Sequence, residues 1–220
     1  MKRRDFLKAT TTLGVAALTF DKLSAALMKN EMAVEVAPDL VAVMGGEPAV
    51  LLQRALKELG GIGKYVKKGQ NVVIKPNIGW DKTPDYAANT NPELVGELIK
   101  QCLQAGAKKV TVFDHTCDNW QRCYENSGMQ KAVKAAGGNL VPANDSSYYK
   151  EVTLPRALKL KKPAIHQALL DADVWFNVPV LKNHGGAKMS IAMKNYMGIV
   201  DNRGYFHSHD LQQCIADICT

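Results

Sequence analysis

Strand-like and helix-like segments alternate along this chain, and this alternation limits the fold more than any other feature. The strand-like segments are short apolar runs, at 40–44, 71–77, 108–114, 139–142 and 173–182. Amphipathic segments of helical length follow them, at 48–59, 91–107, 129–138, 163–172 and 187–200. Near-continuous apolar strands separated by helices are typical of a parallel sheet covered on both faces. The sequence therefore predicts an α/β fold, with a mainly parallel sheet and helices on both faces.

Boundary signals support several of these helices. Asn91 is suited to cap the helix that follows it, and Gly106 is suited to end that helix. The last segment, 209–220, has the composition of a helix, but nothing in the sequence caps it and no strand follows it. We therefore expect the fold to be incomplete at the C-terminus, with part of any site contributed by a longer protein.

The first 26 residues have the features of an export signal. Arg3 and Arg4 are followed by Asp-Phe-Leu-Lys, which resembles the twin-arginine consensus. The uncharged run Ala9–Phe20 is too short to span a bilayer of about 30 Å as a helix. We expect a twin-arginine signal peptide at 1–26, a single α/β domain at 27–220, and an exported or periplasmic mature protein with no stable membrane span. An amphipathic N-terminal helix or a retained anchor is the alternative.

The charge of the chain does not indicate nucleic-acid binding. The formal net charge is +7, and five basic residues against two acidic ones place +3 of it in the first 26 residues. The remaining charge is spread thinly, without the basic stripe or interleaved aromatic residues of a nucleic-acid surface. We therefore expect no nucleic-acid partner.

The five cysteines do not form a recognisable metal motif. No pair has the C-x-x-C spacing, so the chain itself carries no zinc or iron–sulfur signature. Cys102 falls on the apolar side of a predicted helix and is expected to be buried. Cys117 and Cys123 are close enough in sequence to pair across a loop, although the odd count and low density argue against a disulfide framework.

Polar side chains follow three of the predicted strands at the points where the strands end. Lys75 and Asn77 follow the second strand, Asp114 follows the third, and Lys182, Asn183 and His184 follow the last. The carboxyl ends of parallel strands meet at one edge of a sheet, where open α/β sheets bind their ligands. The sequence therefore predicts that these side chains form one crevice.

The segment after the last strand adds further candidates. Two glycines, Gly185 and Gly186, would let the backbone approach a ligand, and the helix expected over 187–200 would direct its N-terminal amides at an anion. Lys194 and Asn195 lie later on that helix and Arg203 follows it, all three as expected ligand-binding residues.

A metal site is a further hypothesis. His207 and His209 would lie on the same side of an extended chain, and His184 with Asp114 would complete a shell of nitrogen and oxygen ligands. An exposed, histidine-rich loop is the simpler interpretation of the same residues. No P-loop, H-E-x-x-H or G-x-S-x-G motif is present, so no cofactor is indicated by a motif.

Three segments together resemble the domain of unknown function 362 family. They are "VVIKPNIGW", "NPELVGELIKQCLQAGAKKVTVFDHT" and "FNVPVLKNHGGAKMSIAMKNYMGIV", followed by Arg203 and His207. The resemblance covers nearly everything after about residue 40. It implies that a common set of residues forms one site: Lys75, Asn77, Asp114, Lys182, His184, Lys194 and Asn195. It also implies an association with twin-arginine export and with ferredoxin-like iron–sulfur modules, although this chain has no such cysteine run.

Two classes of function fit these residues. In an enzyme, the cations would hold a carboxylate or phosphate substrate, while His184, Asp114 or Lys182 would transfer a proton or act as a nucleophile. In a binding or accessory protein, the same crevice would hold an anionic cofactor without changing it. A redox partner protein is a third interpretation, and it rests on the family resemblance alone.

Overall fold

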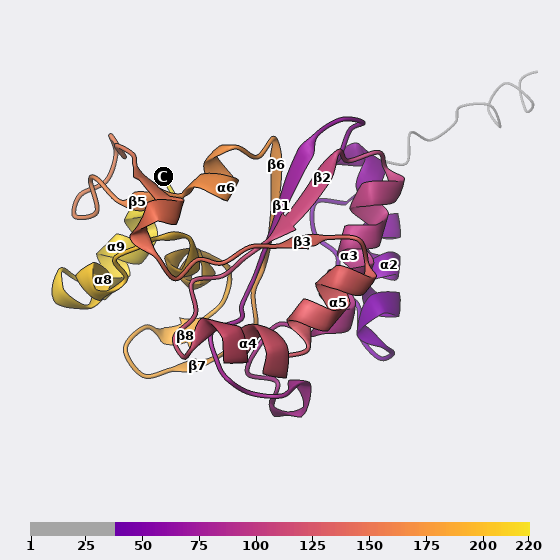
Figure 1. Ribbon diagram of the computed structural model, residues 1–220, viewed down its shortest axis with the longest axis horizontal. Helices are drawn as coiled ribbons and strands as arrows, with labels where there is room; N and C mark the ends of the chain where they lie inside the picture. The colour runs from indigo at the N-terminus through magenta and orange to yellow at the C-terminus, as the bar shows by residue number, and fades with distance from the viewer. Residues whose placement is uncertain (1–37) are drawn as a thin grey trace, which may run out of the picture. The chain divides into compact units, whose positions relative to one another are not determined.

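A four-stranded parallel sheet forms the centre of the protein in the computed structural model, which describes residues 38–220 (Figure 1). In spatial order its strands are β3 (Asn139–Leu140), β2 (Lys109–Val112), β1 (Asn71–Pro76) and β6 (Val174–Val178). At the centre of the sheet, Val73 of β1 lies opposite Thr111 of β2 and Trp175 of β6. The predicted α/β class with a mainly parallel sheet is confirmed.

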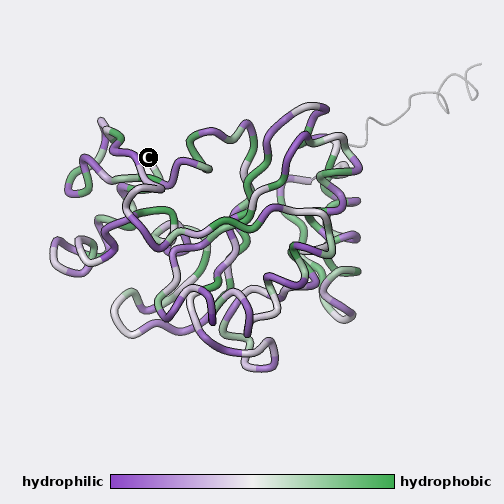
Figure 2. The backbone as a smooth tube through the Cα atoms, viewed as in Figure 1, coloured by the Kyte–Doolittle hydropathy of each residue, from purple (hydrophilic) through white to green (hydrophobic). Residues whose placement is uncertain are grey.

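Three helices cover one face of the sheet. They are α2 (Pro48–Glu58), α3 (Pro92–Gln104) and α5 (Met129–Ala135), which lie together to one side of the strands in Figure 1. Along α3, Val95, Leu98, Ile99 and Cys102 recur at helical spacing and are fully or almost fully buried. They pack with Val72 and other apolar residues of the strands, so the predicted burial of Cys102 is confirmed. In Figure 2 the central strands are largely green, which marks hydrophobic residues.

The other face is covered by the C-terminal half of the chain. Val73 of β1 and Phe113 turn toward this side, because successive residues of a strand point to opposite faces. They pack against η4 (Tyr196–Ile199), α8 (Gly204–Ser208) and α9 (Leu211–Asp217), together with an antiparallel pair, β4 (Tyr149–Glu151) and β5 (Ala164–His166). Helices therefore lie on both faces of the sheet, as expected.

The remaining elements are short. They are η1 (Ile62–Lys64), η2 (Pro84–Tyr86), α4 (Trp120–Asn126), η3 (Ser146–Tyr148), α6 (Gln167–Leu170), β7 (Lys182–His184), β8 (Lys188–Ser190) and α7 (Ala192–Asn195). Asn91 caps α3 as predicted, since its side chain accepts hydrogen bonds from the amides of Glu93 and Leu94.

Three expected elements differ in the structure. Residues 40–44 form no strand, and Leu40 and Met44 are 85% and 87% exposed, so no sheet position holds them. The helix expected over 163–172 begins instead as β5, and only the four residues of α6 are helical. Both segments are apolar as expected, but whether a segment pairs with another strand decides its conformation.

The long helix expected over 187–200 is the most consequential error. Residues 182–190 form an antiparallel hairpin, in which Lys182 pairs with Ser190 and His184 with Lys188. The chain reverses at Gly185-Gly186, and Lys188 adopts a left-handed backbone conformation with φ of 64°. Only the short α7 and η4 follow. A helix N-terminus directed at an anion is therefore absent from this segment.

The last segment is helical, but it is capped, contrary to expectation. The Asp210 side chain accepts a hydrogen bond from the Gln213 amide at the start of α9. Near its end, Asp217 is buried and accepts backbone hydrogen bonds from Leu158, Lys159 and Leu160. Burial alone would raise the pKa of Asp217, but these bonds hold it at about 2. The carboxylate thus fastens α9 to the loop before β5.

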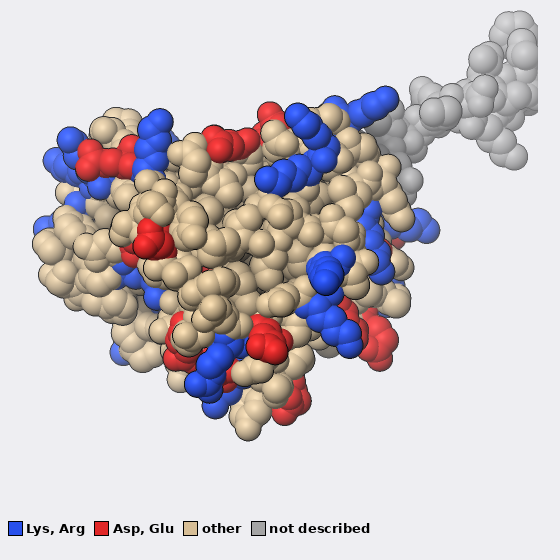
Figure 3. Space-filling view, viewed as in Figure 1, with Lys and Arg blue, Asp and Glu red and all other residues tan. Residues whose placement is uncertain are grey.

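Charged residues on the face shown in Figure 3 are intermixed around a largely uncharged centre, with no continuous basic stripe on that face. Within residues 38–220, no helix combines the length and the apolar character needed to cross a membrane. Residues 39–220 form one compact unit. The signal peptide predicted at 1–26 and the domain start predicted at 27 lie outside the described residues.

Candidate functional site

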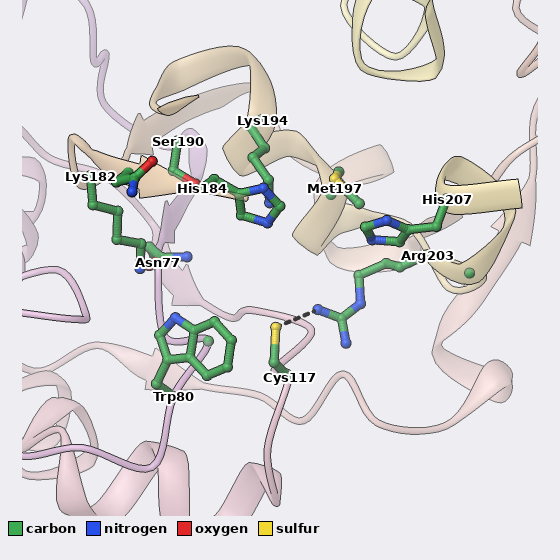
Figure 4. A pocket seen from close by; sticks show the side chains of 13 residues that line it. Asn77, Trp80, Cys117, Lys182, His184, Ser190, Lys194, Met197, Arg203 and His207 are labelled. Carbon is green, nitrogen blue, oxygen red and sulfur yellow. Dashed lines mark hydrogen bonds between the residues drawn. The ribbon is translucent and has the colours of Figure 1, made fainter. Parts of the chain in front are cut away.

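A pocket of about 490 Å³ lies at the carboxyl edge of the sheet (Figure 4). In the sheet, β1 lies between β2 and β6. The chain after β1 continues to α3 on one face of the sheet, whereas the chain after β6 continues to the layer on the other face, so the two loops diverge. Such switch points are where open α/β sheets bind ligands. The pocket is lined from the loops after β1 and β2, from the hairpin after β6, and from the segment 194–207.

The walls of the pocket carry an excess of positive charge. Three permanent cations line it, Lys182, Lys194 and Arg203, together with His184 and His207. No aspartate or glutamate is among the lining residues. A cavity lined by charges of one sign concentrates ligands of the opposite sign.

Lys182 is held at one end of the pocket. Its ammonium donates to Asn77 Oδ1 at 2.7 Å and to the carbonyl oxygen of Ala88. It also lies 5.9 Å from the centre of the Trp80 ring. Burial lowers the pKa of Lys182, and the nearby Lys194 charge acts in the same direction. The structure thus joins Lys182 and Asn77, two predicted site residues that are 105 positions apart in the sequence.

Lys194 is the least engaged of the three cations. The described part of the chain offers its ammonium no hydrogen-bond or ion-pair partner. The side chain is half-buried, and burial lowers its pKa, to which the Arg203 charge contributes. A half-buried ammonium without a partner is available to bind an anion.

Arg203 lies across the pocket from the hairpin in Figure 4. One guanidinium nitrogen, Nη2, donates to the carbonyl oxygen of Thr116, and Nη1 donates to Cys117 Sγ at 3.2 Å. Its Nε is buried and has no partner among the described residues. The two bonds fix the orientation of the guanidinium and leave a second N–H on each of Nη1 and Nη2.

His184 is oriented by its own hairpin. Its Nδ1 accepts a hydrogen bond from the Ala187 amide at 2.9 Å, so the neutral ring carries its proton on Nε2. Burial lowers the pKa of His184 below 6.5, and the neighbouring Lys194 and His207 act in the same direction. The ring is therefore mostly neutral at pH 7, with an N–H to donate. Asn183 also lines the pocket.

Lys75 and Asp114 do not line the pocket but form a buried ion pair beside it. Lys75 Nζ lies 2.6 Å from Asp114 Oδ1, and the two side chains are only 1% and 2% exposed. The other carboxylate oxygen accepts from the Ile78 amide at 2.6 Å. Burial lowers the pKa of Lys75 although Asp114 opposes that effect. The structure therefore places Asp114, a predicted catalytic residue, outside the lining of the pocket, with its carboxylate enclosed and paired.

Asn195 connects this ion pair to the pocket. Its Oδ1 accepts from Lys75 Nζ at 2.9 Å, and its Nδ2 donates to Asn177 Oδ1 at 2.7 Å and to the Lys75 carbonyl oxygen at 3.2 Å. Asn195 is itself buried and is not among the residues that line the pocket. Because Asn195 directly follows Lys194, the network fixes the segment that carries Lys194.

The predicted pair of metal-ligating histidines is not brought together. His207 lies on α8 and lines the pocket, whereas His209 stacks on Tyr205 with the ring centres 3.8 Å apart. The expected extended geometry is wrong because residues 204–208 are helical, and residues two apart point to different sides of a helix. Residues 38–220 contain no group of three His, Cys, Asp or Glu side chains placed to hold a metal ion.

The structure adds pocket residues that the sequence reasoning missed, including Trp80, Cys117, Ser190 and Met197. Trp80 and Cys117 each lie a few residues beyond a strand end, so extending the same rule along these loops would have found them. Cys117 and Cys123 do not form a disulfide, since both are free and Cys123 is buried.

The fold and the pocket together define an α/β protein with a cation-lined cavity at the switch point of a parallel sheet. The chain belongs to the family described as "Domain of unknown function (DUF362)", which matches residues 72–220. It is 30% identical over 152 residues to the "Thylakoid-associated protein sll1697" of Synechocystis sp. (strain ATCC 27184 / PCC 6803 / Kazusa). The match covers 69% of this chain and 46% of that protein, so the chain spans about half the length of this curated relative.

Proposed function

We propose that this protein binds a small anionic molecule, bearing carboxylate or phosphate groups, in the pocket at the carboxyl edge of its sheet. The observation that carries the proposal is the composition of the walls: three permanent cations and no carboxylate face one cavity. Lys182 is occupied by Asn77 and the backbone, but Lys194 has no partner in the described part of the chain, and each terminal nitrogen of Arg203 keeps a second N–H.

The size of the pocket fits this class of ligand. Small-molecule sites generally measure about 300–1,000 Å³, and this pocket, at about 490 Å³, falls in the lower half of that range. Charge-assisted hydrogen bonds from ammonium and guanidinium groups are the strongest that side chains make with carboxylates and phosphates. Trp80 and Met197 add apolar surface for the body of an organic anion.

Substitution of Lys194 or Arg203 by glutamine is expected to weaken binding of inorganic phosphate and citrate about tenfold each, since each variant removes one charge-assisted interaction. Isothermal titration calorimetry measures the affinities. Lys100→Gln is the matched control, because Lys100 is an exposed lysine of α3, outside the residues that line the pocket. Equal affinities for all three variants and the unaltered protein would refute the proposal.

Turnover of the bound anion is a second candidate, and His184 favours it. The neutral ring lines the pocket with its proton on Nε2, where it can donate a hydrogen bond to negative charge that develops on a substrate oxygen. The test compares the molecule that co-purifies with the protein before and after incubation, by mass spectrometry. In an enzyme, His184→Gln should prevent the chemical change while the molecule stays bound. If the co-purified molecule never changes, turnover is refuted and binding remains as the only proposed function.

We also propose that the chain is exported by the twin-arginine pathway. The support is the sequence Arg3-Arg4-Asp-Phe-Leu-Lys followed by a short uncharged run. Replacing both arginines with lysines is expected to abolish export, because the pathway reads this pair. Cell fractionation and immunoblotting measure where the protein accumulates, and undiminished export of the double-lysine variant would rule this route out.

A further inference from the structure

Cys117 brings a thiol into the cation-lined pocket. It lies in the loop after β2, three positions beyond Asp114, and its side chain lines the same cavity as Lys182, Lys194 and Arg203 (Figure 4). The loop is fixed, because the Cys117 amide donates to the Gly79 carbonyl at 2.8 Å. The thiol is exposed and free.

The surroundings of this sulfur differ from those of the other cysteines. Its Sγ accepts a hydrogen bond from Arg203 Nη1 at 3.2 Å, the interaction marked in Figure 4. Cys102, Cys123 and Cys214 are buried, while Cys219 is exposed but does not line the pocket. Among the cysteines of the described residues, Cys117 alone is both exposed to a reagent and placed beside the cationic side chains of the pocket.

We propose that Cys117 is a nucleophile of this pocket, directed at an electrophilic carbon carried by the bound anion. The inference rests on the proposed anion binding, since the cations would hold the anion beside the sulfur. The thiolate is the reactive form of cysteine. In the step, the thiol proton passes to water, a sulfur–carbon bond forms, and the bond from that carbon to its leaving group breaks. The leaving group departs with the bonding electrons, so no oxidant or reductant is needed.

The test compares two alkylating reagents of nearly equal size, anionic iodoacetate and neutral iodoacetamide. Each forms a sulfur–carbon bond and releases iodide. Peptide mass spectrometry gives the rate at each cysteine, and the ratio of the iodoacetate rate to the iodoacetamide rate cancels differences in general thiol reactivity. We expect this ratio to be about tenfold or more higher at Cys117 than at Cys219, because a cation-lined cleft accelerates the approach of anions.

Charge removal and competition sharpen the test. Arg203→Gln and Lys194→Gln should each lower the ratio at Cys117 and leave that at Cys219 unchanged. Inorganic phosphate should slow the reaction of iodoacetate at Cys117 and leave its rate at Cys219 unchanged. If phosphate binds by calorimetry but the ratio is the same at both cysteines, Cys117 is not a nucleophile for anions and the binding function stands. If phosphate and citrate do not bind and the ratios are equal, both proposals fail.

Discussion

Replacement of Asp114 by alanine is expected to lower the free energy of unfolding by about 3–5 kcal/mol, because it leaves a buried lysine without its counter-ion. Lys75 and Asp114 are almost fully buried and 2.6 Å apart, and Lys75 is the only partner of Oδ1 in the described part of the chain. The substitution also removes the acceptor of the Ile78 amide. Urea unfolding followed by circular dichroism measures the loss.

A matched double variant separates the charge from the packing. Lys75→Met combined with Asp114→Ala removes both charges, so it should be more stable than Asp114→Ala alone.

The single variant Asp114→Ala should also regain stability as the pH rises toward 10.5. Burial lowers the pKa of Lys75, and in that window the unfolded chain binds more protons than the folded protein. If Asp114→Ala lowers the free energy of unfolding by less than about 1 kcal/mol, the ion pair of Lys75 and Asp114 contributes little to stability.

The second large effect is expected from Gly198→Ala. A β-carbon at this position would lie 2.6 Å from Lys75 Nζ and 2.7 Å from Lys75 Cε, and closer still to Asp114 Oδ1. The backbone has little room to withdraw, because the Gly198 carbonyl accepts from the His115 amide at 3.0 Å. We expect a loss of about 1–3 kcal/mol in the free energy of unfolding, as in other overpacked cores.

The same substitution should also weaken anion binding. Gly198 belongs to the segment that carries Lys194, so moving it displaces an ammonium of the pocket. Gly63→Ala is the control, because a β-carbon there would meet nothing within 4 Å. Unfolding experiments and phosphate titrations on both variants test the expectation. If Gly198→Ala matches Gly63→Ala in both measurements, the close approach to the ion pair has no consequence.

Local sequence patterns were sufficient for the four strands of the parallel sheet and for its first helical layer, although they also predicted a strand at 40–44 that does not form. Asn91, Gly106 and the spacing of Val95, Ile99 and Cys102 are signals contained within a few residues, so they predict α3 without reference to the rest of the chain. The rule that polar residues gather at the carboxyl ends of parallel strands also placed Lys182 beside Asn77 correctly.

Contacts between distant segments explain what the sequence did not reveal. One exception is local: Met189, Met193 and Met197 have helical spacing, yet residue 189 lies in a hairpin strand, because the adjacent strand β7 supplies its partner. Nothing local shows that Lys75 turns inward to meet Asp114, a carboxylate from the loop after β2. The direction of a side chain at a strand end depends on what packs there, and that is decided by residues more than a hundred positions away.

The two hydrophobic clusters on opposite faces of the sheet come mainly from different halves of the chain, and the pocket is assembled where those halves meet. Asn77, Trp80 and Cys117 come from the earlier half, whereas all three permanent cations come from residues 182–203. An occupant of this cavity would therefore act as a tether between the layers. Because the occupant would bind only when the C-terminal layer is docked, its binding would stabilise the docked state. Conversely, a variant that loosens this layer should bind the occupant more weakly.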